Sequence, residues 1–259
     1  MLTVETVHAE GERYAASLLL VPGLWAGRAV WRAVAGLLGH RGWECHLAEV
    51  RGLPGGHAGR AAALGEYAAT LPAPPVLIGH DAGALLALAA ARHAAAAALV
   101  LVAPLAPGSR GARALTISLA TLRALLVGGP VPPPAGWRAA LVAGDLPAAA
   151  RGPVLAAWGP EDAAMVRDVA WGRIALAPVP GVPALLVAGD RDPLLPSATA
   201  AALAGAVGAE HRVLEGAGHW PLAGPAWQRA VDLVHRWVVQ QLGAPLLDLY
   251  AEAMAERES

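Results

Sequence analysis

The chain alternates short apolar runs with segments of helical periodicity, and this alternation constrains the fold more than any other feature. The runs SLLLV at residues 17–21 and ALVLV at residues 98–102 are apolar almost throughout, which is typical of strands buried on both faces. Residues 29–41, 58–71 and 82–93 repeat apolar side chains at helical spacing. Strands joined through helices form parallel sheets, so the sequence predicts an α/β protein.

The alternation stops near Pro104 and resumes at residues 182–188. The residues between are mainly helical in pattern and are interrupted by GGPVPPPAGW. A helical insertion over the carboxyl ends of the strands accounts for this, because active sites of open α/β sheets lie at those ends. We therefore expect a mostly parallel central sheet flanked by helices, formed by residues 1–106 and 182–259, with a helical cap at residues 107–181.

The two ends of the chain carry further local signals. Residues 2–10 and 14–21 are interpreted as a hairpin about Gly11, and residues 226–242 as a long amphipathic helix. Residues 245–259 are expected to form an extra helix with a solvated tail. Its apolar start, PLLDLY, offers a contact surface for a second copy of the chain, so a homodimer is one expectation.

Composition excludes several functional classes. The chain is 56% hydrophobic, but its longest apolar stretch, residues 84–104, is broken by Arg92 and His93, which argues against a membrane segment. The first residues are acidic where a signal peptide is basic, and Cys45 has no partner, so a cytoplasmic location is expected. A net charge of -1 without a basic cluster argues against nucleic-acid binding.

The segment VLIGHDAGALLALAAA carries the first candidate for chemistry. Gly79 and Gly83 flank Asp81 between a predicted buried strand and a predicted helix. Small flanking residues permit a sharp, strained turn that projects its central side chain, the context of a nucleophile elbow. Locally the sequence is equally compatible with an acid that only caps a helix N-terminus.

Two later segments favour the first interpretation. GDRDPLLP follows a predicted strand and contains Asp192, and EGAGHWP follows the next and contains His219. The order nucleophile, acid, histidine along the chain is the order of the α/β-hydrolase superfamily. The chain resembles that superfamily over nearly its whole length. VPGLWAGRAVW also resembles its oxyanion loop, with Pro22 in the place of the usual histidine. The pattern G-x-x-D-x-x-x-P favours Asp192 over Asp190 as the acid.

The departure from the commonest pattern is aspartate at position 81 where serine is usual. The resemblance narrows to the haloalkane dehalogenase and epoxide hydrolase branches, in which such an aspartate attacks an sp³ carbon and histidine-activated water cleaves the ester. It implies these roles for Asp81 and His219, with Asp192 orienting the histidine. Dehalogenases carry tryptophan where Ala82 stands, and epoxide hydrolases use cap tyrosines that this chain lacks between residues 107 and 181.

Several residues are expected to bind the substrate. Tryptophans and few polar groups in the cap predict an apolar cavity for a hydrophobic or aromatic small molecule. The oxyanion and substrate-binding candidates are Leu24, Trp25, Ala82, Trp137, Trp158, Trp171 and Trp220.

Three hypotheses remain open on the sequence. The first is a hydrolase with Asp81 as nucleophile; the second is a cofactor-independent lyase, cyclase or oxygenase, as in secondary metabolism, with His219 or Asp81 as base; the third is a non-catalytic ligand-binding member of the fold. The sequence shows no HExxH motif, cysteine pair or phosphate loop, so neither a metal nor another cofactor is expected.

Overall fold

The computed structural model describes residues 2–11 and 13–258, and the side chains of this range up to residue 243. Its centre is a seven-stranded sheet in which every neighbouring pair is parallel except the edge pair β1 and β3. This confirms the predicted α/β class with a mostly parallel sheet. The strands, in spatial order, are β1 (Thr3–Val7), β3 (Cys45–Glu49), β2 (Leu18–Val21), β4 (Val76–His80), β5 (Ala98–Val102), β8 (Ala184–Gly189) and β9 (Glu210–Leu214).

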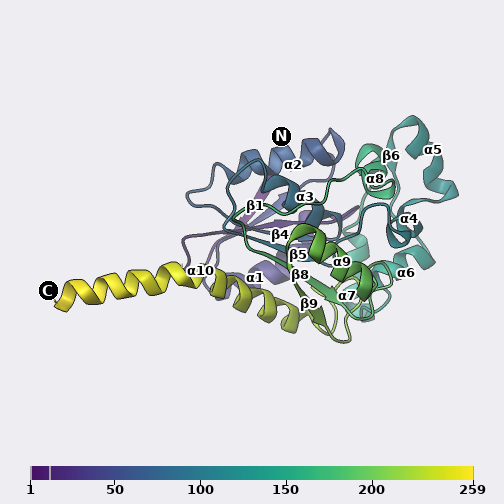
Figure 1. The fold of residues 1–259 in the computed structure, drawn as a ribbon. Helices are drawn as coiled ribbons and strands as arrows, with labels where there is room; N and C mark the ends of the chain where they lie inside the picture. Colours follow the sequence, from purple (N-terminus) through teal and green to yellow (C-terminus); the bar gives the residue numbers. More distant parts are fainter. Residues whose placement is uncertain (1, 12, 259) are drawn as a thin grey trace.

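Helices cover both faces of the sheet (Figure 1). On one face lie α1 (Arg32–His40), entered through the 3-10 turn η1 (Arg28–Trp31), and α10 (Trp227–Glu258). On the other lie α2 (Gly56–Ala68) and α3 (Ala82–Ala90), and α9 (Ser197–Val207) packs beside β8 and β9. Strands β2, β4 and β5 are buried at every residue because both faces are covered.

The predicted N-terminal hairpin is wrong. Strand β1 pairs antiparallel with β3, and β3 lies between β1 and β2. The physical reason is burial: β2 is apolar at every position and takes a place inside the sheet, between β3 and β4, whereas β1 (TVETV) is half exposed and suits an edge. The two segments are adjacent in sequence, which suggested the hairpin. Their pairing differs because β2 is apolar and has to be covered on both sides by other strands.

The β5–β8 connection, residues 103–183, gathers at one end of the sheet (Figure 1). It is mainly helical, as the sequence predicted, and it also holds a two-stranded ribbon that the sequence did not predict. Helix α8 of the connection packs on α2, which ties the two parts together. Its elements are α4 (Arg110–Thr116), α5 (Leu119–Val127), β6 (Pro130–Val131), α6 (Trp137–Ala143), α7 (Ala148–Ala156), β7 (Glu161–Asp162) and α8 (Ala163–Ala170).

Helix α10 runs without interruption from Trp227 to Glu258, so the structure has one helix where the sequence predicted two. The side chains of the PLLDLY stretch lie outside the described residues. Among the helices of residues 2–11 and 13–258, none combines the length and mean hydropathy that crossing a bilayer requires.

Candidate active site

The turn between β4 and α3 places Asp81 at the carboxyl edge of the sheet. Asp81 has φ 55°, a value that residues other than glycine rarely adopt. A Cβ atom on Gly79 would lie 2.2 Å from the carbonyl oxygen of Gly83, and one on Gly83 would lie 2.4 Å from that of Pro22. Only glycine therefore fits at both positions, which explains why the segment folds as a strand, sharp turn and helix.

The Asp81 carboxylate is fixed by backbone groups. Its Oδ2 atom accepts a hydrogen bond from the Leu24 N–H at 3.1 Å. Burial raises the pKa of Asp81 to about 6, while the positive charge of His219 and the amides of Leu24 and Ala82 counteract this effect. The carboxyl group therefore titrates close to neutral pH instead of near its ordinary value.

His219 and Asp192 form a tight pair on the loops after β9 and β8. The Nδ1 atom of His219 lies 2.8 Å from Oδ2 of Asp192, and Oδ1 of Asp192 accepts from the amides of Leu194 and Leu195. Burial alone would lower the pKa of His219, but Asp192 and Asp81 outweigh it and raise that pKa. Burial alone would raise the pKa of Asp192, but the charge of His219 and the hydrogen bond with it outweigh this effect, so the pKa of Asp192 is lowered.

The three side chains converge, as the sequence analysis expected of this set. Nε2 of His219 lies 4.0 Å from Oδ1 of Asp81, and neither atom has a hydrogen-bond partner among the described residues. The side chains of His219 and Asp192 are fully buried and that of Asp81 is 5% exposed. The acid–histidine pair is thus shielded from solvent, and Asp81 is nearly so.

Two further residues support the histidine and were not predicted. Nε2 of His80 donates to the backbone carbonyl of His219 at 2.8 Å. Oδ2 of Asp145, on the loop between α6 and α7, accepts from the Gly218 N–H at 2.8 Å. No sequence motif marks Asp145, because its contact depends on how the β5–β8 connection folds back over the histidine loop.

The predicted substrate-binding residues divide into three groups. Leu24, Trp25, Ala82 and Trp220 are buried around the Asp81 turn or against His80, whose ring centroid lies 4.4 Å from that of Trp220. Trp158 is half buried at the junction with Ala26. Trp137 and Trp171 are 60% and 40% exposed, each beneath an arginine, so the structure does not bring these two into the closed site.

The donor set around Asp81 is suited to proton transfer. A carboxylate, an imidazole and a second carboxylate in series can hold a proton and orient a base, but within the residues that the structure describes no three His, Cys, Asp or Glu side chains form a group that could hold a metal ion. The arrangement can place one carboxylate oxygen and one imidazole nitrogen on either side of a reacting atom or a water molecule.

The sheet order, the strained turn after β4 and the acid–histidine pair after β8 and β9 define the chain as an α/β-hydrolase-fold protein. The profile of the alpha/beta hydrolase family matches residues 18–233, and the chain belongs to this family. A search of curated protein sequences found no match.

Solved structures with the same fold are distant in sequence. A thermophilic esterase from Thermogutta terrifontis has a TM-score of 0.68 and 20% identity, with 93% of each chain covered. A monoacylglycerol lipase from Paleococcus ferrophilus has a TM-score of 0.72 and 19% identity, and the match covers 93% of this chain and 99% of the other. A soluble variant of monoglyceride lipase from Saccharomyces cerevisiae has a TM-score of 0.74 and 13% identity, and the match covers 93% of this chain and 92% of the other.

Proposed function

We propose that the protein is a hydrolase that uses Asp81 as a nucleophile on an electrophilic sp³ carbon of a hydrophobic small molecule. One observation supports this most directly: the two oxygens of Asp81 have different environments. Oδ2 is bound by the Leu24 N–H, whereas Oδ1 has no hydrogen-bond partner in the part of the chain that the structure describes and faces the similarly unpartnered Nε2 of His219 at 4.0 Å. Oδ1 is thus free to attack, while Oδ2 is held by the backbone N–H of Leu24, which we call the amide cradle.

In the first step, Oδ1 of Asp81 attacks the carbon, and the bond from carbon to the leaving group breaks with its electron pair. The product is an alkyl ester of Asp81. A carboxylate suits this carbon better than an acyl carbon, since attack on an ester carbonyl would give an anhydride that readily reverts. Ordinary esterase chemistry is therefore not our proposal, although the structural relatives include esterases and lipases.

In the second step, Nε2 of His219 takes a proton from water, and the hydroxide attacks Cγ of Asp81. Negative charge develops on Oδ2, where the Leu24 amide stabilises it. The ester C–O bond then breaks, the alcohol leaves with the proton from His219, and Asp81 keeps one oxygen from water. Asp192 orients His219 and stabilises its positive charge throughout.

The leaving group sets the substrate class. Tyr14 stacks on Trp43 and Tyr67 bonds His46, so neither lies at the site to protonate an alkoxide. A leaving group that departs as a stable anion, such as halide, suits the site better than an epoxide oxygen. The closed, buried surroundings favour an apolar molecule, with residues 107–181 acting as the cap.

A single turnover in heavy-oxygen water tests the proposal. With a panel of 1-bromoalkanes and styrene oxide as probes, we expect one heavy oxygen in the peptide that contains Asp81. His219→Gln should instead accumulate the ester, seen as added mass on Asp81, because the water is no longer activated. Asp81→Asn is the control and should show neither. Product formed in the wild type with no heavy oxygen on Asp81 would contradict a covalent step.

A second function is favoured by one observation: burial raises the pKa of Asp81 to about 6. A carboxylate with that pKa is a useful general base near neutral pH, and His219 offers a second one. The same fold could then remove a proton from an acidic carbon in elimination, cyclisation or reaction with oxygen. Turnover retained in Asp81→Asn and lost in His219→Ala would support this function with His219 as the base, whereas turnover lost in Asp81→Asn with no ester or heavy-oxygen label on Asp81 in the wild type would support it with Asp81 as the base. Ligand binding without turnover in any variant would support a non-catalytic role.

A further inference from the structure

Trp25, directly after Leu24, has an unusual backbone. Its φ is 61°, in the left-handed region that favours glycine, and its side chain is buried. Such a conformation persists only where the surroundings hold it. The N–H from which Oδ2 of Asp81 accepts a hydrogen bond belongs to the preceding residue, Leu24, so contacts that anchor Trp25 also restrain the segment that carries this N–H.

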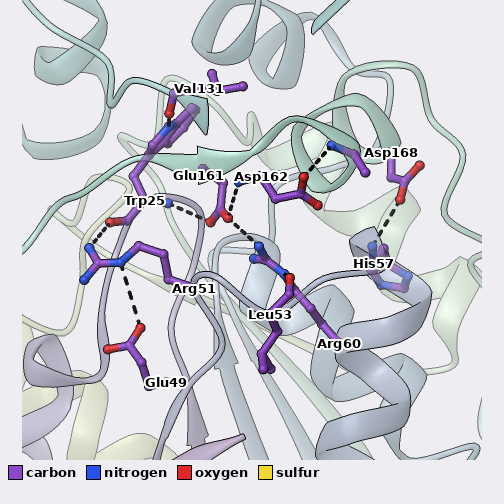
Figure 2. Close-up of polar contacts among 11 residues, drawn as sticks. Trp25, Glu49, Arg51, Leu53, His57, Arg60, Val131, Glu161, Asp162 and Asp168 are labelled. Carbon is purple, nitrogen blue, oxygen red and sulfur yellow. Dashed lines mark hydrogen bonds and ion pairs between the residues drawn. The ribbon is translucent and has the colours of Figure 1, made fainter. Parts of the chain in front are cut away.

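The β5–β8 connection contacts each polar group of Trp25, and Figure 2 draws the contacts of its N–H and its indole. The Trp25 N–H donates to Oε2 of Glu161 at 3.3 Å, and its indole Nε1 donates to the Val131 carbonyl at 3.2 Å. Its carbonyl accepts from the Gly159 N–H at 2.9 Å. From the core, Arg51 joins the two parts, since Nη1 donates both to that carbonyl and to the carbonyl of Ala157, at 3.1 Å each.

Glu161 is itself fixed by a buried ion pair. Nη2 of Arg60 lies 2.6 Å from Oε1 of Glu161, and each side chain is 1% exposed. The same Oε1 accepts from the Asp162 N–H at 2.8 Å, and Nε of Arg60 donates to the Leu53 carbonyl at 3.2 Å (Figure 2). With Oε1 occupied in this way, Oε2 is directed at Trp25.

A buried ion pair is a poor way to gain stability, because the cost of removing two charges from water consumes much of their attraction. Apolar residues of similar size would fill the same space equally well without that cost. What the pair supplies and apolar residues cannot is a carboxylate oxygen held at one place beneath the Trp25 N–H. That contrast favours an orienting role over a purely structural one.

We infer that Glu161, held by Arg60, is a positioning residue that fixes the loop of Leu24 and Trp25 so that the Leu24 N–H meets the Asp81 carboxylate. The inference rests on the proposed function for its kinetic meaning. Since Glu161 belongs to the β5–β8 connection, the amide cradle at Asp81 is complete only when that connection is seated on the core. Any displacement of the connection would remove the contacts that hold Trp25.

Two matched double variants test this without leaving a charge buried alone. Arg60→Met with Glu161→Gln removes both charges and keeps an oxygen for the Trp25 N–H, whereas Arg60→Met with Glu161→Leu removes both charges and the oxygen. Carbon-13 NMR titration of the Asp81 carboxyl reads the cradle directly. Because the Leu24 amide lowers the pKa of Asp81, the leucine double should titrate higher than the glutamine double. Equal titration of the two would overturn the inference.

Rapid-quench mass spectrometry with a 1-bromoalkane supplies the kinetic arm. We expect the ester on Asp81 to form at similar rates in both doubles and to hydrolyse about 10- to 100-fold more slowly in the leucine double, since Oδ2 gains charge only in the second step. If the ion pair of Arg60 and Glu161 were merely structural, the double variants would have a lower Tm but the same ratio of ester-formation rate to ester-hydrolysis rate. That result would count against a positioning role.

The two proposals fail separately. Absence of ester and of heavy-oxygen label in the wild type overturns the covalent function, while the titration difference still decides the role of Glu161. If the leucine double does not fold, Glu161→Asp replaces it, because it keeps the negative charge beside Arg60 and withdraws the carboxylate from Trp25. A titration of Asp81 identical to wild type in that variant would overturn the inference.

Discussion

The imidazole of His80 donates a hydrogen bond from Nε2 to the backbone carbonyl of His219 at 2.8 Å. His80 is the last residue of β4 and directly precedes Asp81, so one strand end carries a candidate nucleophile and a support for the candidate base. A carbonyl can only accept, so Nε2 carries the proton. Burial, together with the charge of His219, lowers the pKa of His80 to about 3, which keeps its ring neutral.

His80 predicts a loss of stability in mild acid. Its folded pKa is depressed, so its stabilising contribution is complete above the unfolded value near 6.5 and declines as pH falls toward 3. At pH 5 the loss is about 2 kcal/mol. Urea unfolding of wild type and His80→Gln at pH 7.5 and pH 5 measures it. The glutamine amide can still donate to the His219 carbonyl but does not titrate, so an equal loss in both proteins would exclude His80 as the cause.

Local patterning predicted most strands and helices to within a few residues, because burial on both faces leaves a continuous apolar run and a covering helix leaves a periodic one. Asp81, Asp192 and His219 were predicted from their order and from the small residues around them. Contacts made by the β5–β8 connection escaped prediction, since Glu161 and Asp145 acquire partners only through its folding over the core. The exposed positions of Trp137 and Trp171 had the same cause.

Asp81→Asn should be more stable than wild type at neutral pH. A carboxyl whose pKa is raised to about 6 is stabilised in its protonated form, so ionisation costs stability as pH rises from about 4 to above 6. The full cost is about 3 kcal/mol above that range. Asparagine can still accept from the Leu24 N–H. Thermal unfolding at pH 7.5 and pH 4 should show a higher Tm for the variant only at the higher pH; a gain of the same size at both would point to packing instead.

The two steps of the proposed reaction should depend on pH differently. Ester formation needs ionised Asp81, so its rate should rise about tenfold between pH 5 and pH 7. In His219→Gln this rise should move to higher pH, because the positive charge that lowers the pKa of Asp81 is gone. Rapid-quench measurement of added mass on Asp81 gives both profiles. Profiles that coincide, or a rate independent of pH, would contradict attack by this carboxylate.

Gly79→Ala should be strongly destabilising, because its Cβ would overlap backbone atoms of Gly83 and Ala84, which cannot move without breaking the turn at Asp81. We expect a loss of about 3 kcal/mol or failure to fold. Gly36→Ala is the matched control: it lies in α1 with nothing within 4 Å of the added Cβ, and should be stabilised by about 0.5–1 kcal/mol. Urea unfolding of both variants checks the contrast, and similar effects would disprove the steric account.

Asp145 offers a way to separate charge from geometry at the histidine loop. Its carboxylate accepts from the Gly218 N–H and its charge contributes to the raised pKa of His219. Asp145→Asn keeps an acceptor and removes the charge, whereas Asp145→Ala removes both. NMR titration of His219 should show a lower pKa in each variant. Turnover should fall only in the alanine variant, by about fivefold, since one hydrogen bond is worth about 1 kcal/mol. An equal fall in both would mean that the charge, and not the hold on Gly218, is what the histidine requires.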